Sequence, residues 1–315
     1  MARRALGPAA LQIVQAVAEV PDQPLVVACS GGPDSLALAA AAAEVGRRRH
    51  QDVRAIVIDH GLQPGSAEVA VGVVAQLSER LRLSAEVVPV RVEAAGTGWE
   101  AAARTARYAG LEAATTDAEL ILLGHTLDDQ AETVLLGLAR GSGPRSLAGM
   151  PPARGRFRRP LLGLRRTVTR DACEQWGLDP WTDPHNGEDR FTRVRVRTRV
   201  LPVLEAELGP GIAEALARSA DLLRTDADFL DALAAEHQEL AASERLDCVA
   251  LAALAPAVGS RVLRAWLVNR GASEVTARHL AAVSALVTAW RGQRWVELPG
   301  LRVRREGAAL VSVHG

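Results

Sequence analysis

Residues 25–38 read LVVACSGGPDSLAL, an apolar run that gives way to a glycine-rich turn and then resumes as a helix-forming stretch. The run is typical of a buried strand, and the residues after the turn favour a helix. Gly31 and Gly32 let the backbone approach an anion without a Cβ in the way, and the helix would present free N–H groups to it. The segment therefore predicts a phosphate-binding turn, although an ordinary capped turn is the alternative.

The basic residues of the chain are all of one kind. The 315 residues include 37 arginines and no lysine. This excludes lysine-nucleophile and Schiff-base chemistry, as well as a phosphate loop that depends on lysine. The formal net charge is zero, so any nucleic-acid surface has to be local.

The cysteines and the apolar runs predict where in the cell the protein lies. Cys29, Cys173 and Cys248 lie far apart and form no Cys-x-x-Cys, which favours reduced thiols over a zinc or iron–sulfur site. No apolar run approaches the roughly 18 residues that a membrane helix needs, and the first twenty residues lack the core of a signal peptide. We expect a cytoplasmic protein with no membrane partner.

Four short apolar runs, each followed by a stretch of helical length, occupy residues 25–29, 54–59, 85–90 and 120–124. This alternation predicts an α/β fold, Rossmann-like, in which helices cover both faces of a parallel sheet. Ligands bind such sheets at the carboxyl ends of the strands. The polar segments Ser30–Ser35, Asp59-His60 and Gly124-His125 all fall there.

The remainder of the chain differs in composition. Residues 140–200 contain 14 arginines against six acidic residues, with several prolines, which predicts an Arg-rich, loop-rich segment with one helix near 167–177. From about 206 the pattern is helical and ends in short strands joined at Pro-Gly and Glu-Gly turns. We therefore predict two domains, one of residues 1–205 that includes the Arg-rich segment, and a smaller, mostly helical one of residues 206–315 with a short β end.

The SGGPDS turn after a buried strand resembles the pyrophosphate loop of the PP-loop ATP pyrophosphatase family (adenine nucleotide alpha hydrolase-like). Members of that family cleave ATP to AMP and pyrophosphate, and their loop has no obligatory lysine. The resemblance implies ATP and Mg²⁺ as cofactors. It places the nucleotide and its phosphates at Ser30, Gly31, Gly32, Pro33, Asp34, Ser35 and Asp59.

Further motifs follow in order: DHGL (59–62), EAAARTARY (100–108), GHTLDDQAET (124–133), RGSGPRSLAGM (140–150), RPLLGLRR (159–166) and TRVRVRTRVLPVLE (192–205). Together they resemble the tRNA(Ile)-lysidine synthetase family. The resemblance implies that ATP adenylates the C2 oxygen of the wobble cytidine in the CAU anticodon of an isoleucine tRNA, and that free L-lysine then displaces AMP. Oligomeric state is left open, with a homodimer as one option.

Carboxylates are the predicted catalytic groups. Asp34 and Asp129 lie at matching strand ends and are predicted metal ligands, because Mg²⁺ prefers carboxylate, water and phosphate oxygens. Asp128, Asp129 and Glu132 open a helix at a spacing that lets Glu132 share a face with either aspartate. Such a cluster would hold the substrate ammonium and help the attacking amine to lose a proton. The alternative is that these acids only complement the helix dipole.

The resemblance adds His125 and Arg107 to the catalytic set, with His125 donating to a phosphate or to the adenylate. Each of these residues also has an alternative interpretation. His125 would be a structural histidine, Arg104 and Arg107 would lie on a solvated helix face, and Asp59 would only form a turn. The Arg-rich segment is the predicted site for tRNA phosphates, unless its arginines only solubilise the surface. The predicted tRNA-binding residues are Arg104, Arg140, Arg145, Arg193, Arg195 and Arg197.

Three other functions compete with this interpretation. A thiolase of the same superfamily would need a cysteine for persulfide or an iron–sulfur cluster, and none is suitably placed. A small-molecule amidating enzyme such as an NAD synthetase would leave the Arg-rich segment and the helical domain unexplained. A non-catalytic ATP-binding module would bind ATP without releasing pyrophosphate. One position departs from the lysidine synthetase pattern, because Val194 stands where that family usually has Asn.

Overall fold

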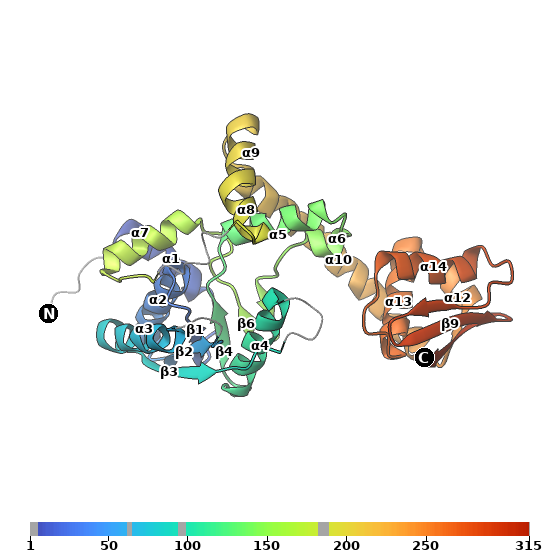
Figure 1. Cartoon of the computed structure of the whole chain (residues 1–315), viewed down its shortest axis with the longest axis horizontal. Coiled ribbons are helices and arrows are strands. Elements are labelled where there is room, and N and C mark those ends of the chain that lie inside the picture. The colour runs from blue at the N-terminus through green and yellow to red at the C-terminus, as the bar shows by residue number, and fades with distance from the viewer. Residues whose placement is uncertain (1–5, 62–64, 94–98, 182–188, 315) are drawn as a thin grey trace. The chain divides into compact units, whose positions relative to one another are not determined.

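The computed structural model describes residues 6–61, 65–93, 99–181 and 189–314 (Figure 1). Leu62 of the DHGL motif lies outside these ranges. The chain divides into two compact units, one of Met1–Gly141 with Gly149–Ala220 and one of Ser142–Ala148 with Asp221–Gly315. This division falls inside helix α10 (Ile212–Ala235), and the domain boundary after residue 205 stays a prediction.

A six-stranded sheet forms the centre of the first unit, in the order β3-β2-β1-β4-β6-β5. Its strands are β1 (Leu25–Ala28), β2 (Val53–Asp59), β3 (Ser84–Pro89), β4 (Leu120–Leu123), β5 (Ala153–Arg154) and β6 (Phe157–Arg158). All paired strands run parallel except β5 and β6. The predicted parallel α/β fold is confirmed, and the four predicted strands lie within one residue of the observed bounds.

The central strands separate two apolar layers. Leu25 and Val27 of β1 join the larger core, whereas Val26 packs on the opposite face with Ile121 and Phe157. This alternation follows from the pleat of a strand, and each buried Leu or Val contributes about 2 kcal/mol. Because both faces are covered, the strands read as continuous apolar runs.

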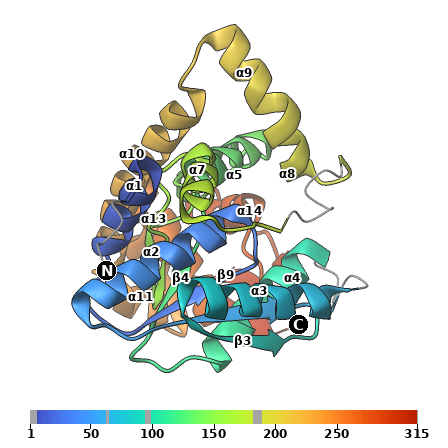
Figure 2. The same ribbon diagram turned by 90° about the vertical axis from the view of Figure 1, so that its left-hand side faces the viewer.

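Helices cover both faces of this sheet (Figures 1 and 2). α1, α2, α3 and α7 pack in the larger core, while α4 packs on the opposite face. Their bounds are α1 (Pro8–Ala18), α2 (Pro33–Arg49), α3 (Ser66–Leu81), α4 (Trp99–Ala113) and α7 (Arg166–Trp176). α7 agrees with the helix predicted near 167–177.

A third apolar cluster joins α5 (Leu127–Ala139) to the helical segment near the end of the first unit. That segment consists of α8 (Thr192–Arg195), the π-helical turn η2 (Val196–Val200) and α9 (Leu201–Leu208). Val196 and Leu201 pack with Leu127 and Ala131 of α5. Val194, at the position where the family usually has Asn, is buried. The packing fixes a segment rich in arginine against the helix that carries the predicted catalytic acids.

The second unit combines helices with a four-stranded antiparallel sheet in the order β7-β10-β9-β8. Its core surrounds Trp266, which is fully buried and donates its indole N–H to the Ser243 carbonyl at 2.9 Å. The predicted Pro-Gly and Glu-Gly turns place Gly300 and Gly307 at positive φ between the last strands. Besides α10, its elements are α6 (Pro144–Leu147), α11 (Gln238–Ala242), β7 (Arg245–Asp247), α12 (Cys248–Ala253), α13 (Pro256–Asn269), α14 (Ala277–Thr288), β8 (Val296–Leu298), β9 (Leu301–Glu306) and β10 (Ala309–His314).

One ion pair at the amino end of β4 makes the stability of the first unit depend on pH. Glu119 accepts two hydrogen bonds from Arg54, at 2.8 and 3.1 Å, and two from the N–H and hydroxyl of Thr116. These bonds lower the pKa of Glu119 to about 2. Because the folded pKa lies below the unfolded one, the stabilisation is complete above about pH 4.5 and is lost as the pH falls toward 2.

Glu119→Gln is expected to lower the free energy of unfolding at pH 7 by about 1–2 kcal/mol, because it removes a well-bonded, largely buried carboxylate. Urea denaturation at several pH values should show this difference shrinking between pH 4.5 and 2. Glu86→Gln is the matched control, since Glu86 also pairs with Arg54 but has a side chain that is 55% exposed. A loss for Glu119→Gln that stays constant down to pH 2 would contradict the assignment.

Candidate active site

The strand order reverses between β1 and β4. From β1 the sheet extends through β2 to β3, whereas β4 pairs with the other side of β1. Ligands of open α/β sheets bind at the carboxyl ends of the strands beside such a reversal. The SGGPDS turn follows β1 and the GHTLDDQAET motif follows β4, so these two predicted motifs meet at one edge of the sheet.

Two glycines shape the turn after β1. Gly31 is buried with a φ of +82°, and a Cβ there would lie 2.4 Å from the Cγ2 of Val73. Gly32 is the N-cap of α2 and has no side chain to bond the first N–H groups of that helix, which begins at Pro33. The positive end of α2 is therefore suited to a phosphate.

Ser35 holds the turn closed. Its hydroxyl accepts the backbone N–H of Ser30 at 3.1 Å and donates to the Gly32 carbonyl at 3.0 Å. Ser35 is buried, whereas Ser30 is exposed. Ser35 thus supports the backbone of the turn, and Ser30 is the hydroxyl that a ligand can reach.

Gly124 lets the end of β4 approach the first turn of α2. A Cβ at Gly124 would lie 3.1 Å from the carbonyl group of Asp34 and from the backbone nitrogen of Ser35. Only glycine fits this approach without a shift of the backbone. The segment from His125 to Asp129 therefore starts directly beside the SGGPDS turn.

A capping box fixes the start of α5. Oδ2 of Asp129 accepts the backbone N–H of Thr126 at 2.8 Å and the Thr126 hydroxyl at 2.9 Å, while Thr126 Oγ1 accepts the Asp129 N–H at 3.5 Å. Such caps contribute about 1 kcal/mol. Asp129 therefore has a structural role, and its other carboxylate oxygen is left for further partners.

Arg166, the first residue of α7, links three of the predicted carboxylates. Its guanidinium lies 2.7 Å from Asp129 Oδ1, 3.4 Å from Glu132 Oε1 and 3.5 Å from Asp34 Oδ2. Thr169, in the first turn of the same helix, donates to the other oxygen of Asp34. The cation of Arg166 thus stands between Asp34 and Asp129, where the sequence predicts Mg²⁺.

The two predicted metal ligands differ in proton affinity. Burial raises the pKa of Asp34, although Thr169 and Arg166 oppose the shift. Burial also acts to raise the pKa of Asp129, but Arg166 and the Thr126 N–H outweigh it and hold that pKa below its usual value. Asp129 is therefore the stronger acid of the pair and is ionised at neutral pH.

Asp128 caps α7 from the neighbouring helix. Its Oδ2 accepts the backbone N–H of Arg166 at 2.7 Å, and its Oδ1 lies 3.2 Å from Nη2 of Arg165. Asp128 therefore fixes the start of α7 and, with it, the backbone that carries the Arg166 side chain. These contacts favour a structural interpretation of Asp128, while its catalytic role stays a prediction.

Glu132 is fully buried and paired with arginines from a separate segment. Nε of Arg197 lies 2.7 Å from Oε1, and Nε of Arg193 lies 3.8 Å from Oε2. A buried carboxylate that lost these partners would cost several kcal/mol. Arg193 and Arg197 direct their guanidinium groups inward at Glu132, and tRNA binding by them stays a prediction.

A small cavity adjoins these ion pairs. Its volume is about 140 Å³, below the roughly 300–1,000 Å³ of ligand pockets. A larger ligand would therefore need some of the ion pairs to open. The lining residues are Asp128, Glu132, Arg165, Arg166, Arg197, Leu201, Pro202, Glu205 and Ala213.

His125, Arg104 and Arg107 lie in one region of the first unit. Burial lowers the pKa of His125 to about 4, and the two arginines add to that shift. The Nδ1 of His125 is buried and has no hydrogen-bond partner in the described part of the chain. Its ring is therefore neutral at pH 7 and able to accept or donate a hydrogen bond.

The two arginines of this region differ in their contacts. Arg104 donates to the Tyr108 hydroxyl at 3.2 Å and stacks on its ring. Arg107 makes no hydrogen bond or ion pair with any residue that the structure describes. Arg107 is thus the freer of the two to bind an anionic ligand.

Asp59, the last residue of β2, shapes the turn that follows. Its Oδ1 accepts the N–H of Gly61 at 2.9 Å, as the turn-forming alternative expects. The Nδ1 of the adjacent His60 is buried and unpaired among the described residues. A nucleotide-binding role for Asp59 stays a prediction.

The other predicted tRNA-binding arginines lie in different places. Arg140 is exposed at the C-cap of α5. Arg145 belongs to the second unit and pairs with Asp228 at 2.7 Å and with Asp231. Arg195 donates to the backbone carbonyls of residues 189 and 190. Of these three arginines, Arg140 alone has a side chain that forms no hydrogen bond or ion pair with another described residue.

Sequence reasoning missed Arg166 and Thr169 as site residues. Arg166 is the last letter of the RPLLGLRR motif, directly before a predicted helix. That position was the available signal, since the first residues of a helix that starts beside a strand end can reach the ligand edge of the sheet. Their partners lie 30 or more residues away in the chain, so spacing could not reveal the contacts.

Two family models match separate parts of this chain. A family model described as a PP-loop domain matches residues 7–204, and one described as a TilS substrate binding domain matches residues 246–311. A tRNA(Ile)-lysidine synthase of Leifsonia xyli is 54% identical over 91% of this chain and 88% of its own length. A tRNA(Ile)-lysidine synthase of Mycobacterium tuberculosis is 51% identical over 90% of each chain.

A solved structure shares the fold over much of this chain. The U34-tRNA thiolase NcsA from Methanococcus maripaludis, with its [4Fe-4S] cluster, superposes with a TM-score of 0.55 at 15% identity. The match covers 69% of this chain and 78% of the thiolase. At that identity the likeness concerns the fold and not the reaction.

Gly31→Ala is expected to weaken ATP binding at least tenfold, because the new Cβ meets Val73 and the positive φ is strained for alanine. Isothermal titration with ATP measures the effect. Gly72→Ala is the control, since Gly72 lies in α3 with open space around a Cβ. Equal ATP affinities of the Gly31→Ala variant and the wild type would contradict a phosphate site at this turn.

Arg166→Gln is expected to lower the free energy of unfolding by about 3–5 kcal/mol, because it leaves buried carboxylates without their partner. A double-mutant cycle with Glu132→Gln should show a coupling above about 1 kcal/mol. Arg170→Gln, at an exposed position of the same helix, is the control. Additive effects of the Arg166 and Glu132 changes in urea denaturation would rule out the pairing.

Proposed function

This chain belongs to the tRNA(Ile)-lysidine synthase family, and we propose that the edge of the sheet between β1 and β4 is the site where it joins lysine to tRNA. The chain is an ATP-dependent ligase that forms lysidine on isoleucine tRNA. The observation that carries the site is the meeting of two motifs, because Gly124 brings the carboxylate-bearing start of α5 against the first turn of α2.

The reaction has two steps that need different groups. In the first, the C2 oxygen of the wobble cytidine attacks the α-phosphate of ATP and pyrophosphate leaves. In the second, an amine of lysine attacks C2 of the cytidine, AMP leaves with the oxygen, and the amine loses a proton. The first step needs phosphate-binding groups and the second needs carboxylates beside them.

ATP would bind by its phosphates at the turn after β1. The N–H groups at the start of α2, with Gly31, Gly32 and Pro33, offer a cradle without side chains in the way. The exposed hydroxyl of Ser30 would donate to a phosphate, while Ser35 keeps the turn in shape. Asp59 at the end of β2 completes the proposed nucleotide-binding set.

Mg²⁺ would be held by Asp34 and Asp129 together with the phosphates and water. Mg²⁺ usually takes only one or two carboxylates, so the pair fits. The described ranges contain no group of three His, Cys, Asp or Glu side chains arranged for a metal. When bound, the ion would neutralise charge on the phosphates. Arg166 would then have to release one of its contacts with the two aspartates.

L-lysine would be recruited by the carboxylates of α5. Asp129 is ionised at neutral pH and would pair with the substrate ammonium. Glu132 is buried among arginines, so it would bind lysine only if Arg197 or Arg166 gave up a contact. The neutral ring of His125 would accept or donate a hydrogen bond at the adenylated base.

Exposed arginines of the first unit would bind the tRNA backbone. Arg104 on α4 and Arg140, the C-cap of α5, are exposed and are proposed for this role. Arg107 is proposed instead as a catalytic residue that would contact ATP or the reaction centre. Each phosphate contact would make binding more sensitive to salt. Arg193, Arg195 and Arg197 already hold partners in the first unit, so we propose them for tRNA binding only through a rearrangement. Arg145 is proposed on the same condition.

The remaining predictions concern assembly and location. No helix in the described ranges is long and apolar enough to cross a membrane. A cytoplasmic location and a homodimer stay proposals. Gel filtration with light scattering would test the dimer.

The competing functions have less support in the residues. Cys29, Cys173 and Cys248 are all buried free thiols, and burial raises the pKa of each. A buried thiol with a raised pKa is a poor persulfide carrier, so a thiolase is disfavoured. A non-catalytic ATP-binding module would not need the carboxylate cluster beside the phosphate turn.

The decisive assay is incorporation of labelled lysine into isoleucine tRNA with the CAU anticodon in the presence of ATP. Release of AMP and pyrophosphate should match the lysine incorporated. Methionine tRNA is the control substrate. Absence of incorporation, or equal incorporation into both tRNAs, would contradict the proposed function.

Asp129→Asn is expected to reduce lysine incorporation at least 100-fold, because an amide cannot pair with both Arg166 and a substrate ammonium. The capping box predicts a further cost of about 1–2 kcal/mol in unfolding free energy. Asp117→Asn, at a fully exposed position of the same unit, should leave lysine incorporation and the unfolding free energy unchanged. Full activity of the Asp129→Asn variant would remove Asp129 from the catalytic set.

A further inference from the structure

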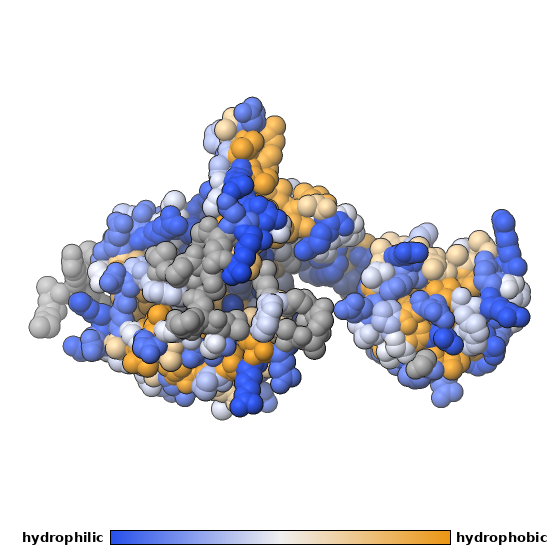
Figure 3. All heavy atoms as spheres, viewed as in Figure 1, coloured by the Kyte–Doolittle hydropathy of each residue, from blue (hydrophilic) through white to orange (hydrophobic). Residues whose placement is uncertain are grey.

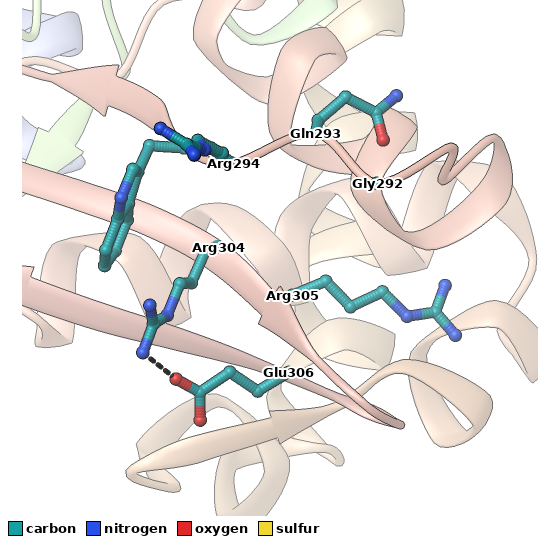
Figure 4. A pocket seen from close by; sticks show the side chains of 7 residues that line it. Gly292, Gln293, Arg294, Arg304, Arg305 and Glu306 are labelled. Carbon is teal, nitrogen blue, oxygen red and sulfur yellow. Dashed lines mark hydrogen bonds and ion pairs between the residues drawn. The ribbon is translucent and has the colours of Figure 1, made fainter.

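A hollow of about 590 Å³ lies in the second unit, between the segment that precedes β8 and strand β9 (Figure 4). Its volume is in the range of ligand pockets. It belongs to the region matched by the substrate binding domain, which spans residues 246–311 without distinguishing one face from another. The lining residues are Gly292, Gln293, Arg294, Trp295, Arg304, Arg305 and Glu306.

The hollow is basic in a chain with no net charge. Residues 290–306 contain five arginines and two glutamates. Glu306 pairs with Arg304, as Figure 4 shows, and Glu297 lies 3.2 Å from Arg302. Arg294 forms no hydrogen bond or ion pair with another described residue. A free guanidinium at the wall of a hollow suits a phosphate or a carboxylate.

Indole rings provide the second feature of the hollow. The guanidinium of Arg304 lies 4.6 Å from the ring centroid of Trp295, whose surface is 37% exposed. Trp290, just before the lining segment, is 45% exposed and has Arg305 at 5.2 Å from its ring centroid. An indole with a cation over its ring and an exposed remainder suits stacking on a nucleobase.

The walls of the hollow are held in place by backbone contacts. Arg305 donates to the carbonyls of Leu286 and Val287 at the end of α14, each at 3.1 Å. Gln293 donates to the Ala289 carbonyl at 3.2 Å and accepts the Arg291 N–H at 2.7 Å. The hollow is therefore preformed, which lowers the entropic cost of binding.

We propose that this hollow binds an unpaired nucleotide of the substrate tRNA, with the base stacked on Trp295 and a phosphate paired with Arg294. The choice of tRNA as the source of the nucleotide rests on the proposed function. Bases of duplex RNA remain stacked on their neighbours and cannot offer a face to an indole, so an unpaired position is required. An acidic peptide would use the arginine and leave the tryptophan without a role.

The test measures direct binding of full-length isoleucine tRNA by filter binding, without ATP or lysine. Trp295→Ala is expected to weaken binding about tenfold, whereas Trp295→Phe should stay within about twofold because phenylalanine still stacks. Arg294→Ala should weaken binding severalfold and reduce the salt slope by about 0.7–0.9. Arg278→Ala, at an exposed position of α14 outside the hollow, is the control and should change neither quantity.

Four outcomes decide the proposal. Loss of affinity in Trp295→Ala with retention in Trp295→Phe supports it, provided that thermal melting shows both variants folded. Unchanged affinity in Trp295→Ala overturns it. An equal loss of tRNA affinity in Trp295→Ala and Trp295→Phe overturns the claim that a base stacks on Trp295. An equal effect of Trp295→Ala on a blunt RNA duplex overturns the assignment to an unpaired nucleotide.

The two proposals can fail separately. If the wild-type protein makes lysidine but Trp295→Ala does not change tRNA binding, the proposed function stands and this inference is wrong. If the wild-type protein makes no lysidine, the proposed function is wrong. The binding measurement would still show whether the hollow takes RNA.

Discussion

The pairing of one largely buried guanidinium with several carboxylates holds the candidate active site together. Arg166 starts α7, and its cation reaches Asp34 on α2 and both Asp129 and Glu132 on α5. Three helices that begin or lie at the same sheet edge are thereby tied through one side chain. Because a buried charge without partners is costly, each of these helices depends on the others for its position. Asp128 strengthens this dependence by capping the helix that carries Arg166.

Close backbone approach is the second condition for the site. Gly31 accepts a left-handed conformation next to Val73, and Gly124 allows β4 to end against α2. A side chain at Gly31 would collide with Val73 of α3, and one at Gly124 would push the end of β4 away from the first turn of α2. Transfer of AMP from ATP to a base needs reacting groups within about 3–3.5 Å, so in the proposed site these two glycines would help by keeping the neighbouring backbone segments close.

Much of the fold and part of the site followed from the sequence, for physical reasons. Strands such as Leu120–Leu123 are buried on both faces and are therefore continuous apolar runs. Such a strand can be predicted from its own residues alone. The turn at Gly31 and the acids at the start of α5 are likewise local. The inward direction of Arg193 and Arg197 was not predictable, because it depends on the burial of Glu132 more than 60 residues earlier. The sequence carries no local signal that tells an arginine facing water from one facing a buried carboxylate.

The ion pairs around α5 also set the charge that L-lysine would meet at the proposed site. Four guanidinium groups, those of Arg165, Arg166, Arg193 and Arg197, pair with Asp34, Asp128, Asp129 and Glu132, and Arg165 also pairs with Glu205 and Glu214. Six carboxylates therefore meet four guanidinium groups, and the network is formally negative. L-lysine carries a net charge of +1 at neutral pH, so it would be attracted by this excess of carboxylates and would then exchange partners at contact distance. Its association rate would then fall as the ionic strength rises, and the polyanionic RNA would depend on exposed arginines elsewhere on the surface. L-lysine and the RNA would thus respond to surface charges of opposite sign.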